Sequence, residues 1–491
     1  MNKTSDTYTV SVHAYWHTLM PPLQHSLVGD AVMINQFEPL VKSGKKGLIE
    51  PLAAKAWDIS ADRKTIRFFI DTSRRFSDGG SLSAADFKRS WEDGLRMQPV
   101  SNNSSLVDVF ANLHGMEDFK KTGALSGVKA GSDGVLELEF EKPVRSALEH
   151  LSGLRYAAYR ISGGRPIGTG AYVIEEADKT LTLSPNKYYS GEAVALRRAR
   201  IVPLPASEAL ARVKAGKVDL VLFAEKADAA PGLGGDAGPI AAAFGQEGTH
   251  LVVNLNARPG RFFSDSASRR AFQALMLKVF DKNNEAWTRS FQTEGFLRDP
   301  QSYLPFQSGR LDDGEAAAII KEGEPGIKKL IADTAARPLL IMSGTGWDWL
   351  AGYLKEAGLS VSEKSRGDFE EKDWLKMMYK TFEPDILPAR ASVTEVDPDG
   401  LYHLLGRNGA IFSPMLERAA VADKLEEGRM LLEQGRIAEH YKGVSREILR
   451  EVPYVHLGYL YRKVAYNPAR LRLKRGLLNR DSYSLLSFEP N

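Results

Sequence analysis

Two histidines near the N-terminus are the first side chains whose type and spacing suggest chemistry. His13 and His17 lie four residues apart, and on a helix this spacing would place both imidazoles on one face, where they could bind a metal ion. The neighbouring residues argue against a helix. Tyr8 to Ala14 alternates as a strand does, and Pro21-Pro22 follows soon afterwards. We therefore predict no metal site here, and packing or ligand contact for both side chains.

Motifs of nucleophilic enzymes and of nucleotide binders are incomplete in this sequence. Ser43-Gly-Lys-Lys46 has the Ser-x-x-Lys spacing of β-lactamases, but it falls in an expected turn and no Ser-Asp-Asn accompanies it. Gly168-Thr169-Gly170 is not followed by Gly-Lys-Ser/Thr, which excludes a P-loop. Gly232-Leu-Gly234 is half of a dinucleotide fingerprint, and we interpret it as part of a loop. We predict no catalytic residue and no cofactor, and we expect that the protein is not an enzyme.

Length and composition indicate a globular protein with more than one domain. The chain has 491 residues, of which 43% are hydrophobic and 26% charged, ordinary fractions for a soluble protein. The net charge of +3 gives no electrostatic footprint for nucleic acid, and we interpret the basic stretch from Arg470 to Arg480 as a solvated face. No run of 18 apolar residues predicts a membrane span. The absence of cysteine excludes disulfides and thiolate metal sites.

The most informative stretch runs from Phe37 to Glu92 and contains three short motifs. The first is Phe37 to Val41. The second starts with Ile49 to Leu52, which we expect to enter a helical turn, and continues with two expected strands over 57–60 and 65–70. The third, Phe76 to Ser90, is a Ser-Asp-Gly-Gly turn that leads into a helix capped by Ser83. Three linked motifs over about fifty residues are much more specific than any one of them.

In this order and at this spacing, the three motifs resemble the signature of the family 5 extracellular solute-binding proteins, the peptide, dipeptide and nickel binders that serve ABC transporters. Later segments are similar to the same family, so the resemblance covers nearly the whole chain. The clearest of these are Pro166 to Tyr172, Asn186 to Tyr189, Gly216 to Val221, Leu251 to Asn256 and Val452 to Leu457.

The resemblance implies an α/β fold of the two-lobed periplasmic-binding-protein type (type II-like), with a small extra α+β subdomain in the first lobe. We expect residues 1–36, 162–249 and 463–491 to form lobe I, and residues 37–161 to form its small subdomain. Residues 250–462 are expected to form lobe II. The strand that begins at Leu251 would be one of two hinge strands between the lobes.

Candidate ligand contacts follow the ends of expected strands, where α/β sheets usually bind their ligands. Tyr15, Trp16 and His17 come directly after the first strand, in a loop that faces the cleft in the family. Trp347 lies between a strand and a helix, and it could offer a flat surface to a ligand or pack in the core.

Two positions depart from the pattern of the peptide-binding members. Those proteins hold the ammonium group of the peptide with an aspartate three residues before an Asp-Pro motif. Counted back from Asp397, that position is Thr394, with Glu395 beside it. An aromatic residue of the family is replaced by Glu371. An ammonium in a closed cleft needs an anionic partner to offset its desolvation. Glu371 or Glu395 could supply it, or the ligand could be an oligosaccharide, a cation or an uncharged molecule.

We predict the solute-binding component of an ABC importer, which captures a small polar and peptide-like solute by closure about the hinge. Its partners would be that solute and the transmembrane permease subunits, and we expect a monomer. The N-terminus shows no signal peptide, so we expect a periplasmic protein whose signal has been removed. The alternatives are a metabolite sensor with the same fold, a binder of an oligosaccharide or of a metal or haem complex, and an enzyme on a borrowed fold.

Overall fold

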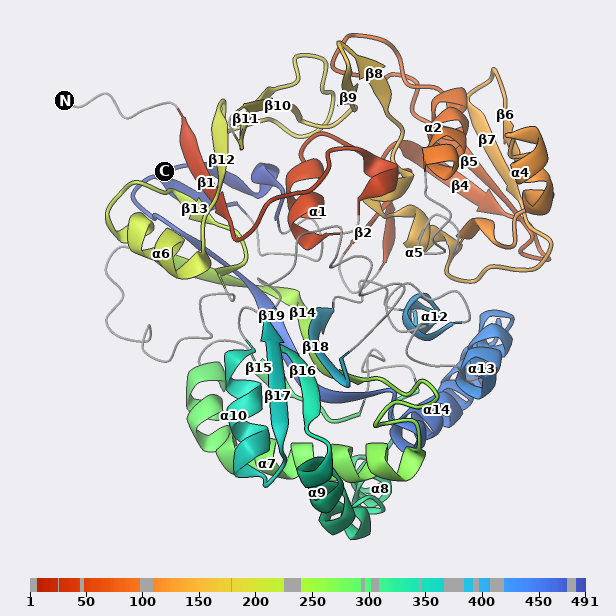
Figure 1. The fold of residues 1–491 in the computed structure, drawn as a ribbon. Helices are drawn as coiled ribbons and strands as arrows, with labels where there is room; N and C mark the ends of the chain where they lie inside the picture. The colour runs from red at the N-terminus through yellow and green to blue at the C-terminus, as the bar shows by residue number, and fades with distance from the viewer. Residues whose placement is uncertain are drawn as a thin grey trace. The chain divides into compact units, whose positions relative to one another are not determined.

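Two compact units make up the chain (Figure 1). The computed structural model describes residues 7–24, 26–44, 48–97, 109–177, 179–224, 240–292, 296–301, 309–343, 347–365, 384–391, 397–406, 419–474 and 483–491. Unit 1 consists of Met1–Val100, Ser104–Glu247 and Arg462–Asn491, and unit 2 of Ser101–Asn103 and Gly248–Tyr461. After residues 247 and 461 the chain passes between the units inside two long strands, β14 (Ala241–Leu255) and β19 (Tyr454–Tyr466). We call β14 and β19 the linking strands.

Unit 1 contains a mixed sheet whose central strand is the first of the chain. In spatial order its strands are β10 (Tyr172–Ala177), β11 (Thr180–Pro185), β12 (Ala199–Pro203), β1 (Tyr8–Val12) and β13 (Leu220–Val221), followed by the end of β19. β1 is parallel to both β12 and β13, so both of its edges are paired, and Val10, Ser11 and Val12 are all buried. Helices α1 (Leu27–Met33) and α6 (Ala206–Lys214) also belong to this unit.

Residues 37–161 of unit 1 hold a second, antiparallel sheet with its own core. Its strands in order are β4 (Ala54–Ile59), β5 (Thr65–Ile70), β7 (Val135–Glu139) and β6 (Val128–Ala130). The alternation in β5 buries Ile66, Phe68 and Ile70 on one face, against helix α2 (Ala84–Met97). That helix contributes Phe87 and Trp91 to the same core. The expected strands at 57–60 and 65–70 are therefore present.

The expected helical turn at Ile49 to Leu52 is wrong. Ile49–Pro51 forms strand β3, which pairs antiparallel with β2 (Val41–Ser43). Pro51 lies opposite Val41 at the end of this two-stranded ladder, a position that proline tolerates because no neighbouring strand needs its missing N–H group. Pairing with a partner strand thus overrode the local sequence preference.

Unit 2 places helices around a sheet that includes the first halves of both linking strands. Beyond β19 and β14 the strand order is β18 (Ile386–Ala391), β16 (Leu339–Ser343) and β17 (Val361–Ser365), and β15 (Phe296–Arg298) pairs with β19. The helices are α7 (Ser266–Gln292), α8 (Asp313–Lys321), α9 (Ile327–Ala336), α10 (Asp348–Glu356), α12 (Gly400–Leu405), α13 (Ala419–Arg429) and α14 (Gln434–Glu451).

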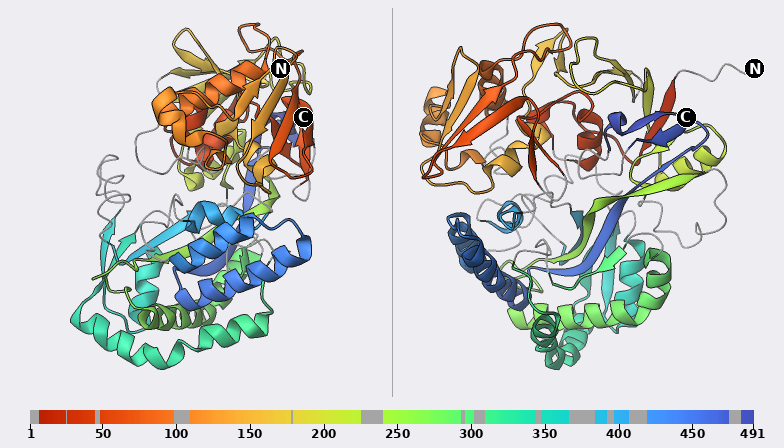
Figure 2. Two further views of the ribbon diagram at one scale, coloured as in Figure 1. Left: turned by 90° about the vertical axis from the view of Figure 1, so that its right-hand side faces the viewer. Right: turned by 180° about the vertical axis from the view of Figure 1, so that it is seen from behind.

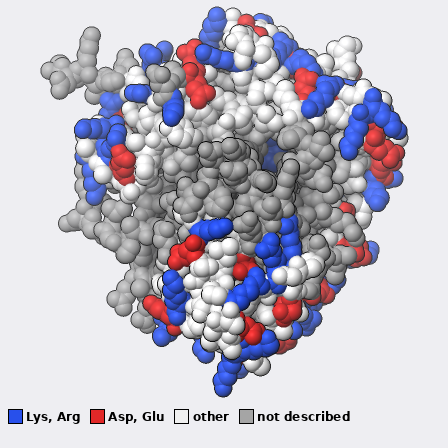
Figure 3. Space-filling model, in the orientation of Figure 1, with Lys and Arg blue, Asp and Glu red and all other residues white. Residues whose placement is uncertain are grey.

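Short elements complete the described part of the chain. They are the helical turns η1 (Pro21–Leu23), η3 (Met116–Asp118), α4 (Phe119–Thr122), α5 (Ala147–Leu151), η4 (Leu154–Tyr156), η6 (Glu324–Gly326) and η11 (Leu485–Ser487), and the strand pairs β8 (Arg160–Ser162) with β9 (Arg165–Ile167) and β20 (Leu471–Leu473) with β21 (Phe488–Pro490). None of the helices described combines the length and apolarity that a bilayer crossing requires. On the face shown in Figure 3, basic and acidic side chains are interspersed.

Candidate ligand-binding residues

The segment that follows β1 presents one aromatic side chain and anchors another. Trp16 is only 3% exposed, and its indole Nε1–H donates a hydrogen bond to Oε1 of Glu176 on β10, at 3.1 Å. Tyr15 is 47% exposed, and its ring meets the Trp16 ring edge-on at 5.8 Å. His17 is exposed and has a φ of 59°. The tryptophan thus fixes the segment on the sheet, while Tyr15 and His17 are accessible to a ligand.

Trp347 occupies a different environment. It precedes α10, is 6% exposed, and packs in the core of unit 2 with its ring 5.4 Å from that of Trp349. Asp397 lies before α12, where its Oδ1 accepts the N–H of Asp399 at 2.8 Å and so shapes the turn into the helix. Contact of a ligand with either side chain stays a prediction. Glu371, Thr394 and Glu395 lie outside the described residues.

A cavity of about 290 Å³ lies within unit 1. Its apolar lining includes Phe37, Leu52 and Leu154, and its polar lining includes Glu38 and Tyr189. Burial raises the pKa of the Tyr189 hydroxyl to about 12, and the nearby Glu38 carboxylate adds to the rise. The hydroxyl is therefore neutral at physiological pH and can act as a hydrogen-bond donor.

Glu38 is a buried acid held by two segments far apart in the sequence. Arg74 donates from Nη1 to Glu38 Oε1 at 2.6 Å, and the Thr169 hydroxyl donates to Oε2 at 2.8 Å. Burial raises the pKa of Glu38, and the positive charge of Arg74 opposes that rise. Glu38 comes from the first sequence motif and Thr169 from the Gly-Thr-Gly motif, so the two motifs meet at one carboxylate.

The glycines on either side of Thr169 allow this meeting. A Cβ atom added to Gly168 would lie 2.2 Å from the carbonyl oxygen of Gln36, and the Gly170 N–H donates to the same oxygen at 2.8 Å. Only a residue without a side chain lets the two backbones approach so closely. The Gly-Thr-Gly motif therefore serves backbone packing.

Comparison with known proteins shows which family part of the chain resembles. Residues 48–276 match the sequence model of the bacterial extracellular solute-binding proteins, family 5 (middle region). This match covers slightly less than half of the chain and supports the resemblance to the family that the sequence motifs indicate. Its fold is similar to that of the murein tripeptide binding protein of Escherichia coli, with a TM-score of 0.82, 18% identity, and coverage of 99% of this chain and 98% of that one. The predicted two-lobed α/β fold is confirmed.

Curated family 5 relatives match over part of their length. A dipeptide-binding protein of Bacillus subtilis is 29% identical over 28% of this chain and 25% of its own. A nickel-binding periplasmic protein of Escherichia coli is 26% identical over 42% of this chain and 40% of its own. The sequence matches thus span less than half of these two relatives, one described as binding a dipeptide and the other as binding nickel.

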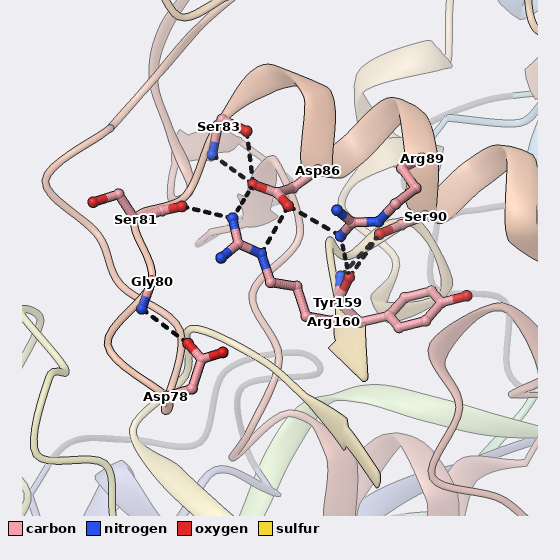
Figure 4. Close-up of polar contacts among 9 residues, drawn as sticks. All are labelled: Asp78, Gly80, Ser81, Ser83, Asp86, Arg89, Ser90, Tyr159 and Arg160. Carbon is pink, nitrogen blue, oxygen red and sulfur yellow. Dashed lines mark hydrogen bonds and ion pairs between the residues drawn. The ribbon is translucent and has the colours of Figure 1, made fainter. Parts of the chain in front are cut away.

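The Phe-Ser-Asp-Gly-Gly motif and the helix after it form a charged network that supports the fold (Figure 4). Arg160 on β8 binds Asp86 of α2 through two hydrogen bonds of 2.9 Å. The Ser83 hydroxyl donates to the same carboxylate at 2.7 Å, and Arg89 lies 3.0 Å from it. Arg160 also stacks over the ring of Phe76 at 4.3 Å. These contacts give the charged residues of the motif a structural role that needs no ligand.

A second buried pair in unit 2 gives the Asp-Pro-Asp-Gly motif a structural role. Asp399 and Arg429 are both buried, 3.2 Å apart, and the guanidinium lies 4.0 Å from the centre of the Tyr402 ring. The pair joins α12 to α13. Nothing in the local sequence signals that Asp399 has a partner thirty residues later. Within the residues that the structure describes, no group of three or more His, Cys, Asp or Glu side chains is arranged to hold a metal ion.

Proposed function

We propose that this protein is the solute-binding component of an ABC importer. The observation that supports this most directly is the family 5 match over residues 48–276, joined to a fold shared over nearly the whole chain with a solved peptide-binding protein. The permease of such an importer would be its protein partner, and the periplasm its location.

The ligand in this proposal is a small polar solute, with a short peptide as the first candidate. Relatives and solved neighbours include proteins described as binding dipeptide, oligopeptide and murein tripeptide, alongside others described as binding nickel. A peptide ammonium needs a carboxylate partner in a desolvated site. Glu371 or Glu395 would serve in place of the aspartate that Thr394 replaces.

Capture would work by a shift between conformations. A solute that contacts both lobes favours the closed form, and the shift is as large as the difference in affinity between the two forms. The linking strands β14 and β19, through which the chain passes between the units, are the segments about which closure would occur. No covalent step and no cofactor enter this mechanism.

A thermal-shift screen tests the proposal. The panel contains di- to pentapeptides, oligosaccharides, free nickel and its histidine complex, and haem. A ligand at a hundred times its Kd stabilises the folded state by about 2.7 kcal/mol, which shifts the melting temperature measurably. A response to peptides supports a peptide carrier, and loss of that response in Glu371→Gln or Glu395→Gln would identify the ammonium partner. A response to another class alone would reject the peptide, while a flat screen would favour a sensor.

The accessible Tyr15 supplies a second test once a ligand is found. Tyr15→Ala should weaken binding by roughly ten-fold, because an aromatic contact of this kind contributes on the order of 1–2 kcal/mol. Ile161→Ala is the matched control, since Ile161 is another exposed apolar side chain of unit 1. Equal affinity of both variants and the unchanged protein, measured by calorimetry, would remove Tyr15 from the site.

A further inference from the structure

The two linking strands carry a pair of buried histidines in direct contact. His250 on β14 is 4% exposed and His456 on β19 is 1% exposed. Nδ1 of His250 lies 2.9 Å from Nε2 of His456, a hydrogen-bond distance. β14 and β19 are neighbours in the sheet of unit 2, as Figure 2 also shows. The pair therefore joins the two strands through their side chains, within the unit and close to where the chain leaves it.

The neighbours of the pair fix which nitrogen carries each proton. Nδ1 of His456 lies 2.5 Å from the backbone carbonyl oxygen of Asp299. A carbonyl oxygen only accepts, so this Nδ1 must carry the hydrogen, and Nε2 of a neutral His456 is then an acceptor. The hydrogen between the rings consequently belongs to Nδ1 of His250. The result is a directional chain in which His250 donates to His456 and His456 donates to Asp299.

Several titratable or charged groups face the pair. The Tyr459 ring lies 4.4 Å from that of His250 and 5.1 Å from that of His456. The buried Asp299 carboxylate is 2.5 Å from Nη1 of Arg310 and accepts the Gln301 N–H. Tyr454 lies near Tyr459, and burial together with Asp299 raises the Tyr459 pKa. On β18 the residue opposite His250 is the uncharged Ala391. Arg310 thus offsets part of the attraction that the Asp299 charge exerts on an imidazolium.

Proton uptake changes this contact from attractive to repulsive. A proton on Nε2 of His456 removes the only lone pair that accepts from His250, and two N–H groups then point at each other. Burial opposes the charge as well: it lowers the pKa of His456 to about 4, despite the nearby Asp299, and lowers that of His250 well below its usual value. Both histidines are therefore neutral at pH 7, and the hydrogen bond is intact.

We propose that His250 and His456 form an acid-sensitive latch between the linking strands: when His456 takes up a proton, the side-chain hydrogen bond that reinforces the pairing of β14 with β19 is lost. The histidines have a depressed pKa in the folded state. The stability that their neutral forms contribute is thus present above the unfolded pKa of about 6.5 and is lost as the pH falls toward about 4. The latch would make the linking strands more pliable in acid. An effect on solute affinity rests on the proposed function, whereas opening of the latch itself does not.

Hydrogen exchange of the ligand-free protein tests the latch directly. Protection factors of the β14 and β19 amides should fall between pH 7.5 and pH 4.5 by up to roughly 70-fold, and clearly more than those of β16 and β17 in the same unit. An equal loss in all four strands would mean global destabilisation and would overturn the proposal. Solute plays no part in this measurement, so its outcome is independent of the importer assignment.

Two variants at one position separate the hydrogen bond from the packing. His250→Phe keeps a ring but cannot donate, so its linking strands should exchange at pH 7.5 nearly as fast as those of the unchanged protein at pH 4.5. His250→Asn retains an N–H donor near the Nδ1 position and should restore the protection at pH 7.5. His114→Asn, which alters an exposed histidine of unit 1, should change nothing. Should His250→Asn exchange as fast as His250→Phe, the hydrogen bond is not the latch.

The assigned tautomers supply a readout that folding alone does not affect. Long-range ¹H–¹⁵N spectra at pH 7.5 should show both histidines protonated at Nδ1. An Nε2-protonated His456 at this pH would contradict the directional chain, and the latch with it.

Discussion

Buried charges at single positions show which interactions hold this protein together. Glu38 with Arg74, Asp299 with Arg310, and Asp399 with Arg429 each remove an acid from water and compensate it with one guanidinium. Breaking such a pair costs far more than its formation contributes, because the remaining charge stays buried. None of these pairs could be predicted from the sequence, since the partners are separated in the chain and charged residues are mostly exposed.

Arg429→Met should lower the free energy of unfolding by about 3–5 kcal/mol, because Asp399 then loses its guanidinium in the interior. Urea unfolding at pH 7 measures the change. Lys329→Met is the control: its pair with Asp333 on α9 is exposed, so it should cost less than about 1 kcal/mol. Similar losses for both variants would contradict a special role for the buried pair.

Gly168→Ala should destabilise unit 1 by more than about 2 kcal/mol, because the added Cβ would overlap the Gln36 carbonyl and that backbone would have to shift. In contrast, Gly352→Ala in α10 meets no neighbouring atom. It should stabilise the protein by about 0.5–1 kcal/mol through helix propensity. Thermal unfolding of the two variants compares them, and a neutral Gly168→Ala would disprove the close approach.

Local sequence pattern predicted some of the helices and strands correctly and others not. The alternation in β5 predicted its strand correctly, since one face packs against α2. Helix α7 runs without interruption from Ser266 to Gln292. A polar run follows Phe280, and no glycine or proline interrupts the helix there. The sequence also placed Tyr15 and His17 after a strand, but it gave no indication that Trp16 would be buried as their anchor.

The ion pair between α2 and β8 should make the stability of unit 1 depend on pH. Burial raises the pKa of Asp86, but hydrogen bonds from Arg160 and Ser83 outweigh burial and lower it below the usual value of 3.8. The stability that ionised Asp86 contributes is thus present above pH 3.8 and is lost as the pH falls below it.

In Asp86→Asn the folded protein should be less stable at pH 7, and this part of the acid-dependent loss should disappear. Urea midpoints measured from pH 7 to pH 3 would show a shallower acid limb. Asp333→Asn, an exposed pair on α9, should leave that limb unchanged. If Asp86→Asn follows the same curve as the unchanged protein, the network does not link α2 to β8 in the way described.

At the scale of the whole molecule, the family motifs were sufficient to predict a two-lobed fold, because they mark the turns and close contacts of that architecture. The motifs do not predict the identity of the solute, because that depends on side chains contributed by segments far apart in the sequence.

Saturation with a solute found in the screen should reduce the radius of gyration measured by small-angle X-ray scattering, because closure makes the molecule more compact. Tyr15→Ala at the same solute concentration should retain more of the larger value. An unchanged radius at full saturation, shown by calorimetry on the same sample, would rule out capture by closure.

The last residues of the chain return to the first lobe. The Leu485 N–H donates to Asn35 Oδ1 at 2.8 Å, β21 pairs with β20, and Leu485 and Phe488 share a core with Val10 and Val12 of β1. During synthesis, the strands that pair with β1 are made early, but part of the core around it is supplied only after all of unit 2 has been made. At roughly 5–20 residues per second, this delay lasts on the order of half a minute or more. A premature stop near residue 480 would therefore leave this core without Leu485 and Phe488 and should yield a less stable chain that proteases cleave more readily.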